Sequence, residues 1–380
     1  MEDNTKQEIP ADLEKQLGSI NDIKKFLDGR LDIWNFGKLL TAIYREEEPL
    51  GERLRRKLSE YDSDGNPENT ARKIRNWLCG RNMPSNREEL FRICFALGLD
   101  EKNTGILLGT TVENGIHFRN PKELIYAYCL RAGIDYPQAV SLVGELWKEP
   151  LPLGTLDYQE YVRRTKETEC CNHMTASVRN RFKGIQTEEG LRSFMNEYRA
   201  FFGYHHNTAY RKFTKMLECL LLPMIVCDAL PLEGAYSIEK VVDEYLRAGM
   251  PYDKRSSGNT ILQKKIKEHW PTAKGVREMY SRKLDVNRKT LILLYVATEG
   301  MMHVHGKNPE VWLREHYKRL DLMLADCGMA ALNLHSPFDF LILQAIHKEN
   351  EDDFMSCRLD FMIRKIFPKE GTAAYIVPKI

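Results

Sequence analysis

The organisation of the chain is clearest in one segment, Thr70-Ala-Arg-Lys-Ile-Arg-Asn-Trp-Leu-Cys-Gly-Arg-Asn-Met-Pro-Ser85. On a helical wheel, at about 100° per residue, its apolar side comprises Ala71, Ile74, Trp77 and Leu78. The opposite side comprises Arg72, Lys73, Asn76 and Cys79, with Arg75 at its edge. Gly80 is a typical helix end. The segment therefore predicts a helix from about Thr70 to Cys79 that buries one side and exposes cations and amides on the other.

The flanking segments also have helical periodicity. Apolar residues recur on one face of 34–44 and of 50–61. A polar turn, Asp62–Asn69, then precedes the third helix. A capping-box pattern of Ser85 and Glu88 begins a fourth helix that Gly98 ends, and Asp100 caps a fifth that extends to Leu108. These five helices predict a domain over about 31–110.

Helical signals dominate the rest of the chain as well. A capping residue before proline begins helices at Asn120-Pro121, Asn308-Pro309 and Ser336-Pro337. Helices are expected near 157–168, 174–184, 188–202, 207–229, 237–247, 259–268, 273–284, 287–299, 309–326, 336–348 and 352–367. Strand-like patterns occur only at 372–377 and at 111–117, where Asn114-Gly115 suggests a hairpin turn or an irregular connection.

We therefore predict an all-α protein with four parts. Residues 1–30 form a polar segment and 31–110 a five-helix domain. Residues 111–154 form a helical extension and a linker, and 155–380 a large helical domain for dimerisation, sensing or interaction.

Composition restricts the classes of function. Of the 380 residues, 43% are hydrophobic and 29% charged, as in globular proteins. The net charge of +2 is too small to attract nucleic acid to the whole protein, so nucleic-acid binding would require a local basic patch. The nine cysteines include no C-x-x-C pair, which favours free thiols in the cytoplasm. The longest apolar run, 220–232, is too short and too interrupted to span a bilayer. We expect a soluble, cytoplasmic protein with no membrane association, metal or cofactor.

The exposed side of the helix near residues 70–79 suits double-stranded DNA. A helix fits the major groove, where arginine pairs with guanine and asparagine with adenine. Lys73, Arg75 and Arg81 would contact phosphates, and backbone amides at a helix N-terminus would add donors. The candidate DNA-binding residues are Thr70, Ala71, Arg72, Lys73, Arg75, Asn76 and Arg81.

The same region resembles the helix-turn-helix family of phage repressors and Cro proteins. The matching residues are Ile74, Trp77, Gly80, Arg81, Pro84, Ser85, Leu90, Ile93 and Ala96-Leu97-Gly98. The resemblance covers about 31–110 and implies five helices, a homodimer and a third helix that reads the major groove. It places Ala71, Arg72 and Asn76 at base-facing positions, with Lys73 beside them.

The sequence departs from that family in the turn before the third helix. The family's turn has about four residues, whereas Asp62–Asn69 is longer and carries three carboxylates, Asp62, Asp64 and Glu68, that would repel phosphates. Glu46, Glu47 and Glu48 end the first helix, and 31–100 contain twelve acidic and twelve basic residues. Docking to a protein therefore stays open beside DNA binding.

Two functions follow from this. The first is a sequence-specific DNA-binding transcription regulator whose C-terminal domain dimerises or senses a small-molecule effector. The second is an accessory or defence-system protein that uses a degenerate helix-turn-helix to bind a protein partner. Segments 287–295, 327–329 and 336–341 are similar to C-terminal regions of helix-turn-helix proteins from low-GC Gram-positive bacteria and their mobile elements.

Enzyme signatures are sparse, and we expect no enzymatic activity. Arg199 and His205 fit the spacing of ribonucleases of the HEPN class, which makes a ribonuclease the third alternative, although Gly203 lies between them. His303 and His305, and Cys170-Cys171 with His173, lack further ligands at metal-binding spacing. The basic stretch 264–289 reads as a solvated face or, as a minority alternative, a second phosphate-contact surface.

Overall fold

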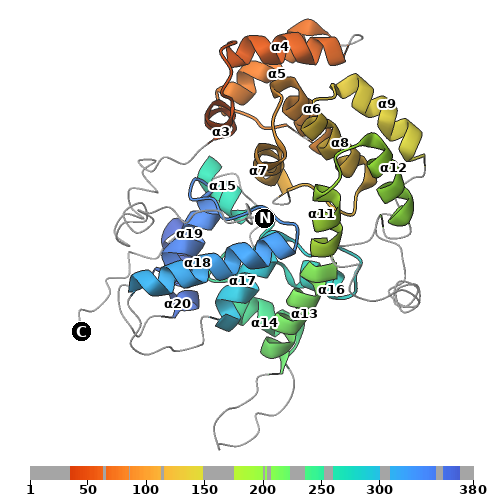
Figure 1. Cartoon of the computed structure of the whole chain (residues 1–380). Helices are drawn as coiled ribbons and strands as arrows, with labels where there is room; N and C mark the ends of the chain where they lie inside the picture. The colour runs from red at the N-terminus through yellow and green to blue at the C-terminus, as the bar shows by residue number, and fades with distance from the viewer. Residues whose placement is uncertain are drawn as a thin grey trace, which may run out of the picture.

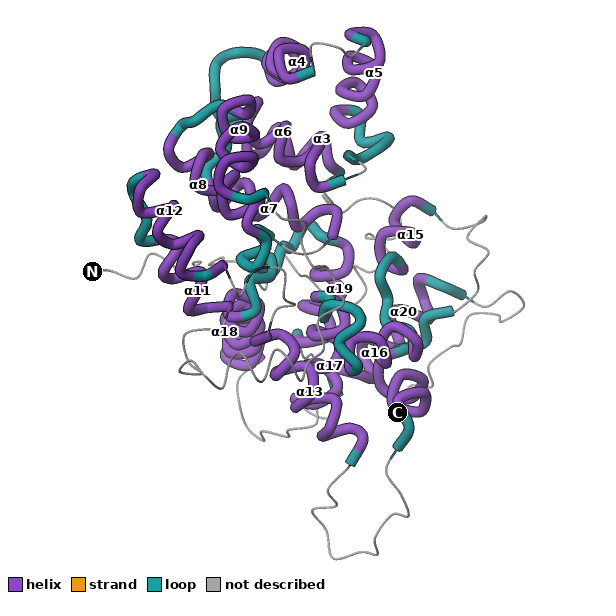
Figure 2. Tube along the Cα trace, turned by 90° about the vertical axis from the view of Figure 1, so that its right-hand side faces the viewer, coloured by secondary structure: helices purple, strands orange, loops and turns teal. Residues whose placement is uncertain are grey.

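The structure is a computed structural model of the chain. It describes residues 35–62, 66–84, 86–112, 115–148, 175–199, 202, 207–222, 236–251, 260–299, 309–347 and 354–368. Every regular element in these ranges is a helix, which confirms the all-α class (Figures 1 and 2). None of the helices in these ranges is both long and apolar enough to cross a bilayer. The helix expected at 157–168 and the strand-like segment 372–377 lie outside the described residues.

The helices of the N-terminal half follow the predicted order. They are α3 (Phe36–Ile43), α4 (Leu50–Tyr61), α5 (Pro67–Leu78), α6 (Arg87–Leu97), α7 (Glu101–Val112), α8 (Pro121–Ala132), α9 (Tyr136–Leu146), α11 (Thr175–Lys183) and α12 (Glu188–Glu197). Because Thr111 and Val112 end α7, a hairpin over 111–117 is wrong, and residues 115–120 form an irregular connection. As expected, Asp100 caps α7 by accepting a hydrogen bond from the Asn103 amide at 2.7 Å.

The C-terminal half is also a set of helices. They are α13 (Asn207–Leu221), α14 (Ile238–Val241) continued by the π-helical turn η4 (Val242–Leu246), α15 (Ile261–Lys267), α16 (Ala273–Tyr280), α17 (Arg288–Glu299), α18 (Pro309–Asp326), α19 (Pro337–Ile346) and α20 (Met355–Ile366). Proline occupies the first turn of α8 and α19 as predicted, but only Asn120 makes a capping hydrogen bond, and Ser336 makes none.

Buried apolar side chains form two clusters, one from Phe36 to Phe202 and one from Ala209 to Phe367. We expected the C-terminal domain to begin near residue 155, but α11 and α12 contribute to the first cluster. Phe182 of α11, for example, lies 6.4 Å from Phe118 and 5.9 Å from Phe194 between ring centroids. The division in side-chain burial therefore falls between residues 202 and 209, and Figure 1 shows α11 between the two groups of helices.

In the first cluster, α6 is the central helix. All of its side chains from Leu90 to Leu97 except Arg92 are buried, as expected of a helix surrounded by others. Helix α4 packs on α6, and α5 packs on α4 and α3. The buried side chains of α4 and α5 in this cluster are Leu54, Leu58, Ile74 and Trp77. Burying an apolar side chain of this size contributes about 1.5–3 kcal/mol, so α5 is held mainly by its neighbours α3 and α4.

The helical extension is fixed to α6 by Glu88. Its carboxylate accepts hydrogen bonds from Tyr126 of α8 at 2.8 Å and Tyr136 of α9 at 2.6 Å, and it pairs with Lys122 at 2.7 Å. Burial opposes ionisation of Glu88, but the hydrogen bonds from Lys122 and the two tyrosines outweigh burial and lower its pKa. The region 115–148 therefore belongs structurally with the first five helices.

In the second cluster, two cations of the basic stretch 264–289 are buried. Arg288 forms a bidentate ion pair with Asp339, at 2.6 and 2.8 Å, and donates to the carbonyl of Ala330. Lys289 donates to the carbonyls of Lys265, Ile266 and Glu268, which satisfies the C-terminal end of α15. The prediction that the basic side chains of 264–289 are exposed to solvent is therefore wrong for Arg288 and Lys289, because both are buried in the apolar core.

Candidate nucleic-acid interface

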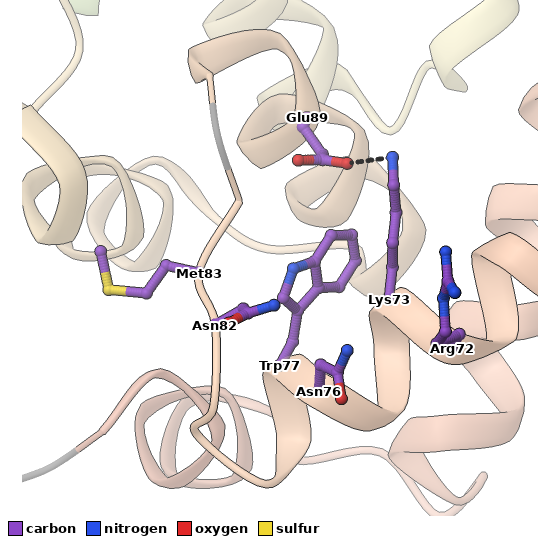
Figure 3. A pocket seen from close by; sticks show the side chains of 7 residues that line it. All are labelled: Arg72, Lys73, Asn76, Trp77, Asn82, Met83 and Glu89. Atoms are coloured by element: carbon purple, nitrogen blue, oxygen red, sulfur yellow. Dashed lines mark hydrogen bonds and ion pairs between the residues drawn. The ribbon is translucent and has the colours of Figure 1, made fainter.

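An open cleft of about 390 Å³ lies on the outer side of α5 (Figure 3). Its walls come from α5, from the loop that follows it and from α6. The lining residues are Arg72, Lys73, Asn76, Trp77, Asn82, Met83 and Glu89. Three of the seven predicted site residues, Arg72, Lys73 and Asn76, therefore lie together in one concave surface.

The predicted two-sided character of α5 is confirmed by burial. Ile74 is fully buried and Trp77 only 4% exposed, while Arg72, Lys73, Arg75 and Arg81 are exposed. Asn76 is half-buried, as are Thr70 and Ala71 at the margin of the apolar side. The guanidinium and amide groups therefore point away from the core.

Helix α5 begins earlier than predicted. Asn66 is its N-cap and accepts a hydrogen bond from the Glu68 amide at 2.9 Å, and Pro67 occupies the first turn. The expected turn Asp62–Asn69 is therefore wrong at its end, and only 62–66 connect α4 to α5. This connection is five residues long, compared with about four in the turn of the helix-turn-helix family. Asp64 lies outside the described residues, and Glu68 sits in the first turn of α5.

The C-terminal end of α5 is fixed by Gly80, whose φ of +66° favours glycine. The amide of Gly80 donates to the Trp77 carbonyl, and the amide of Arg81 donates to the Asn76 carbonyl at 2.9 Å. This is the pairing of a Schellman motif. It positions Arg81 at the helix end beside the cleft.

Lys73 is not the free cation that the sequence suggested. Its ammonium group pairs with Glu89 of α6 at 2.9 Å, across the cleft (Figure 3). The Lys73 side chain is 61% exposed, so this pair contributes little stability. It nevertheless places a carboxylate beside the predicted phosphate contacts.

The remaining cations differ in their partners. Arg72 donates to the Asn69 side chain at 3.3 Å, a long hydrogen bond. Within the described ranges Arg75 and Arg81 form no ion pair. Arg87, the first residue of α6, is bound to Glu123 at 2.6 Å and to the Gly115 carbonyl at 2.7 Å, so it stabilises the fold.

Not all of the acidic side chains of the first helices would repel a phosphate bound at α5. Hydrogen bonds from Arg56 and then Arg53 hold the pKa of Glu48 below its ordinary value, and the same two arginines offset its charge. Glu68 and Asp62 are exposed. The unfavourable charges closest to α5 are thus Glu68 in its first turn and Glu89 across the cleft.

The fourth helix is capped by a different residue from the one predicted. Asn86 accepts a hydrogen bond from the Glu89 amide at 2.8 Å, and α6 begins at Arg87. This cap fixes the backbone from which Glu89 reaches the cleft. Sequence periodicity did not reveal Asn82, Met83 or Glu89 as lining residues, because two lie in a loop and the third was assigned only to a helix start.

The other candidate sites do not assemble among the described residues. The Arg199 guanidinium lies 5.5 Å from the ring centroid of Trp147, and His205 lies outside the described ranges. Cys170, Cys171, His173, His303 and His305 also lie outside them. No group of three or more histidine, cysteine or acidic side chains suited to a metal occurs in the part of the chain that the structure describes.

Comparisons with protein-family models, with curated proteins and with solved structures found no match to this chain.

Proposed function

We propose that the outer face of α5 binds double-stranded DNA in the major groove. One observation carries this proposal: α5 follows α4 after five residues, buries Ile74 and Trp77, and presents Arg72, Arg75 and Asn76 outward. A helix held on a partner helix with its polar side free is the arrangement that helix-turn-helix proteins insert into DNA.

Each exposed group has a defined role in this proposal. Arg72 and Asn76 face the cleft and read base edges, arginine pairing with guanine and asparagine with adenine. Arg75 and Arg81 flank them and contact phosphates without reading sequence. The protein is then a transcription regulator, and the second cluster of helices provides dimerisation or effector sensing.

The experiment is selection of DNA from a random library, followed by affinity measurements on the enriched sequence. Arg72→Ala should relax preference at one base pair and cost about 1–3 kcal/mol. Arg81→Ala should weaken binding to all sequences alike. Lys215→Ala, an exposed cation on α13, is the matched control and should leave binding unchanged. Failure to enrich any sequence at low salt would exclude the proposal.

Docking of a protein in the same cleft is the second candidate. Glu89 and the apolar Trp77 and Met83 favour it, because a carboxylate beside an apolar floor suits a peptide better than a phosphate. A partner that binds at unit stoichiometry and is lost in Glu89→Gln, with no DNA binding at low salt, would support this function over the first.

A further inference from the structure

Helix α18 has an exposed face that the proposed DNA function does not use. Val311 is 52% and Leu322 67% exposed, which is unusual for large apolar side chains. They are eleven residues apart, so at about 100° per residue they lie on one line along the helix, about 16 Å from each other. Their neighbours on that line, Glu315 and Lys318, carry opposite charges.

The order of these four residues is symmetric. The midpoint between Val311 and Leu322 is also the midpoint between Glu315 and Lys318. A two-fold axis through that midpoint would set Val311 of one copy opposite Leu322 of another. The same rotation would set each Glu315 opposite a Lys318. A single exposed leucine is common on protein surfaces. Here, however, the apolar and charged side chains together form a pattern that is complementary to the same face of a second copy.

Both charged side chains on this face reach the protein surface. Lys318 makes no hydrogen bond or ion pair with any residue that the structure describes, and it is exposed. Glu315 pairs with Arg319 at 2.5 Å within the helix, and both are partly exposed.

The opposite side of α18 is firmly buried. Trp312, Leu313, Leu320 and Leu324 belong to the second core cluster. The helix is therefore a rigid support, and its outer face needs no rearrangement to meet a partner. Figure 1 shows α18 on the near side of the C-terminal group of helices, away from α5.

From this geometry we infer that α18 forms an antiparallel two-fold contact with α18 of a second copy of this chain. One pair of helices buries less than a standard interface, so we expect a weak dimer whose population depends on concentration. The inference does not depend on DNA binding, although a two-fold dimer would give an operator with inverted half-sites.

The test is sedimentation velocity of the full chain from about 0.5 to about 100 µM. We expect a concentration-dependent dimer. Leu322→Arg should weaken dimerisation about tenfold or more, because it places a cation against Val311. Leu222→Arg is the matched control, since Leu222 is 62% exposed at the end of α13, and it should have no effect.

A charge reversal tests the antiparallel register. Glu315→Lys and Lys318→Glu should each weaken the dimer, because each places like charges opposite one another at both contacts. The double variant restores opposite charges and should dimerise nearly as well as the wild-type chain. Circular dichroism melting confirms that the variants fold. A monomer throughout the concentration range, or a dimer that survives Leu322→Arg unchanged, would overturn the inference, whatever the outcome for DNA.

Discussion

Gly37→Ala tests how α5 is positioned. Gly37, in the first turn of α3, lies against the last turn of α5, and a Cβ atom on it would stand 2.0 Å from the carbonyl oxygen of Leu78 and 2.6 Å from its carbonyl carbon. Both atoms are backbone, so no side-chain rotation relieves the overlap. Helix α3 or the end of α5 must move by more than about 1 Å, which costs about 1–3 kcal/mol as overpacking.

Gly144→Ala is the matched control. Gly144 lies inside α9, and nothing stands within 4 Å of its added Cβ. Alanine there should stabilise the helix by about 0.5–1 kcal/mol. The two glycine-to-alanine changes should therefore differ in sign although their chemistry is identical.

The assay combines urea unfolding with hydrogen exchange. Gly37→Ala should lower the midpoint of unfolding and speed exchange in peptides that cover 36–43 and 75–82, while Gly144→Ala should do neither. Because the chain has two core clusters, the exchange data assign the change to the first cluster. If Gly37→Ala had the same unfolding midpoint and the same exchange rates as the wild-type chain, the close approach of α3 to α5 would be refuted.

Three further changes follow from individual contacts. Glu89→Gln should free Lys73 for a phosphate contact and steepen the salt dependence of DNA binding by about one unit; an unchanged slope would contradict this role of the ion pair. Burial raises the pKa of Asp321 to about 6, so its ionisation opposes folding as pH rises through that value. Asp321→Asn should therefore stabilise the protein at pH 8, by at most about 3 kcal/mol, with a gain that shrinks toward pH 4; a gain that is constant with pH would count against it. Asp339→Ala should destabilise by about 3–5 kcal/mol because Arg288 stays buried without its partner, and a thermal midpoint near wild type would exclude that role.

Much of the fold follows from local signals in the sequence. The period of Ile74 and Trp77 gave the buried side of α5, and Gly80 and Gly98 gave helix ends with positive φ. The start of α5 was missed at Asn66-Pro67, although the same signature identified the start of α8 at Asn120-Pro121. We assigned Asn66 and Pro67 to the acidic turn, although an asparagine followed by proline is a typical helix start.

Contacts between distant residues could not be predicted in this way. Glu89 reaches Lys73 only because α6 lies beside α5, and Asp339 reaches Arg288 across fifty-one positions. Periodicity within one helix contains no information on such pairs. The two core clusters divide later in the chain than the predicted domain boundary, because Phe182 contacts Phe118, sixty-four positions earlier, and Phe194 of α12.

The most direct test of the DNA proposal is the dependence of the association constant on salt, measured between about 50 and about 200 mM. With Arg75 and Arg81 as the phosphate contacts, the logarithmic slope should be about −1.8 per protomer bound. Arg75→Ala and Arg81→Ala should each reduce its magnitude by about 0.9. No measurable binding at the lowest salt, or a slope that both variants leave unchanged, would contradict the assignment of α5 as a DNA-binding helix.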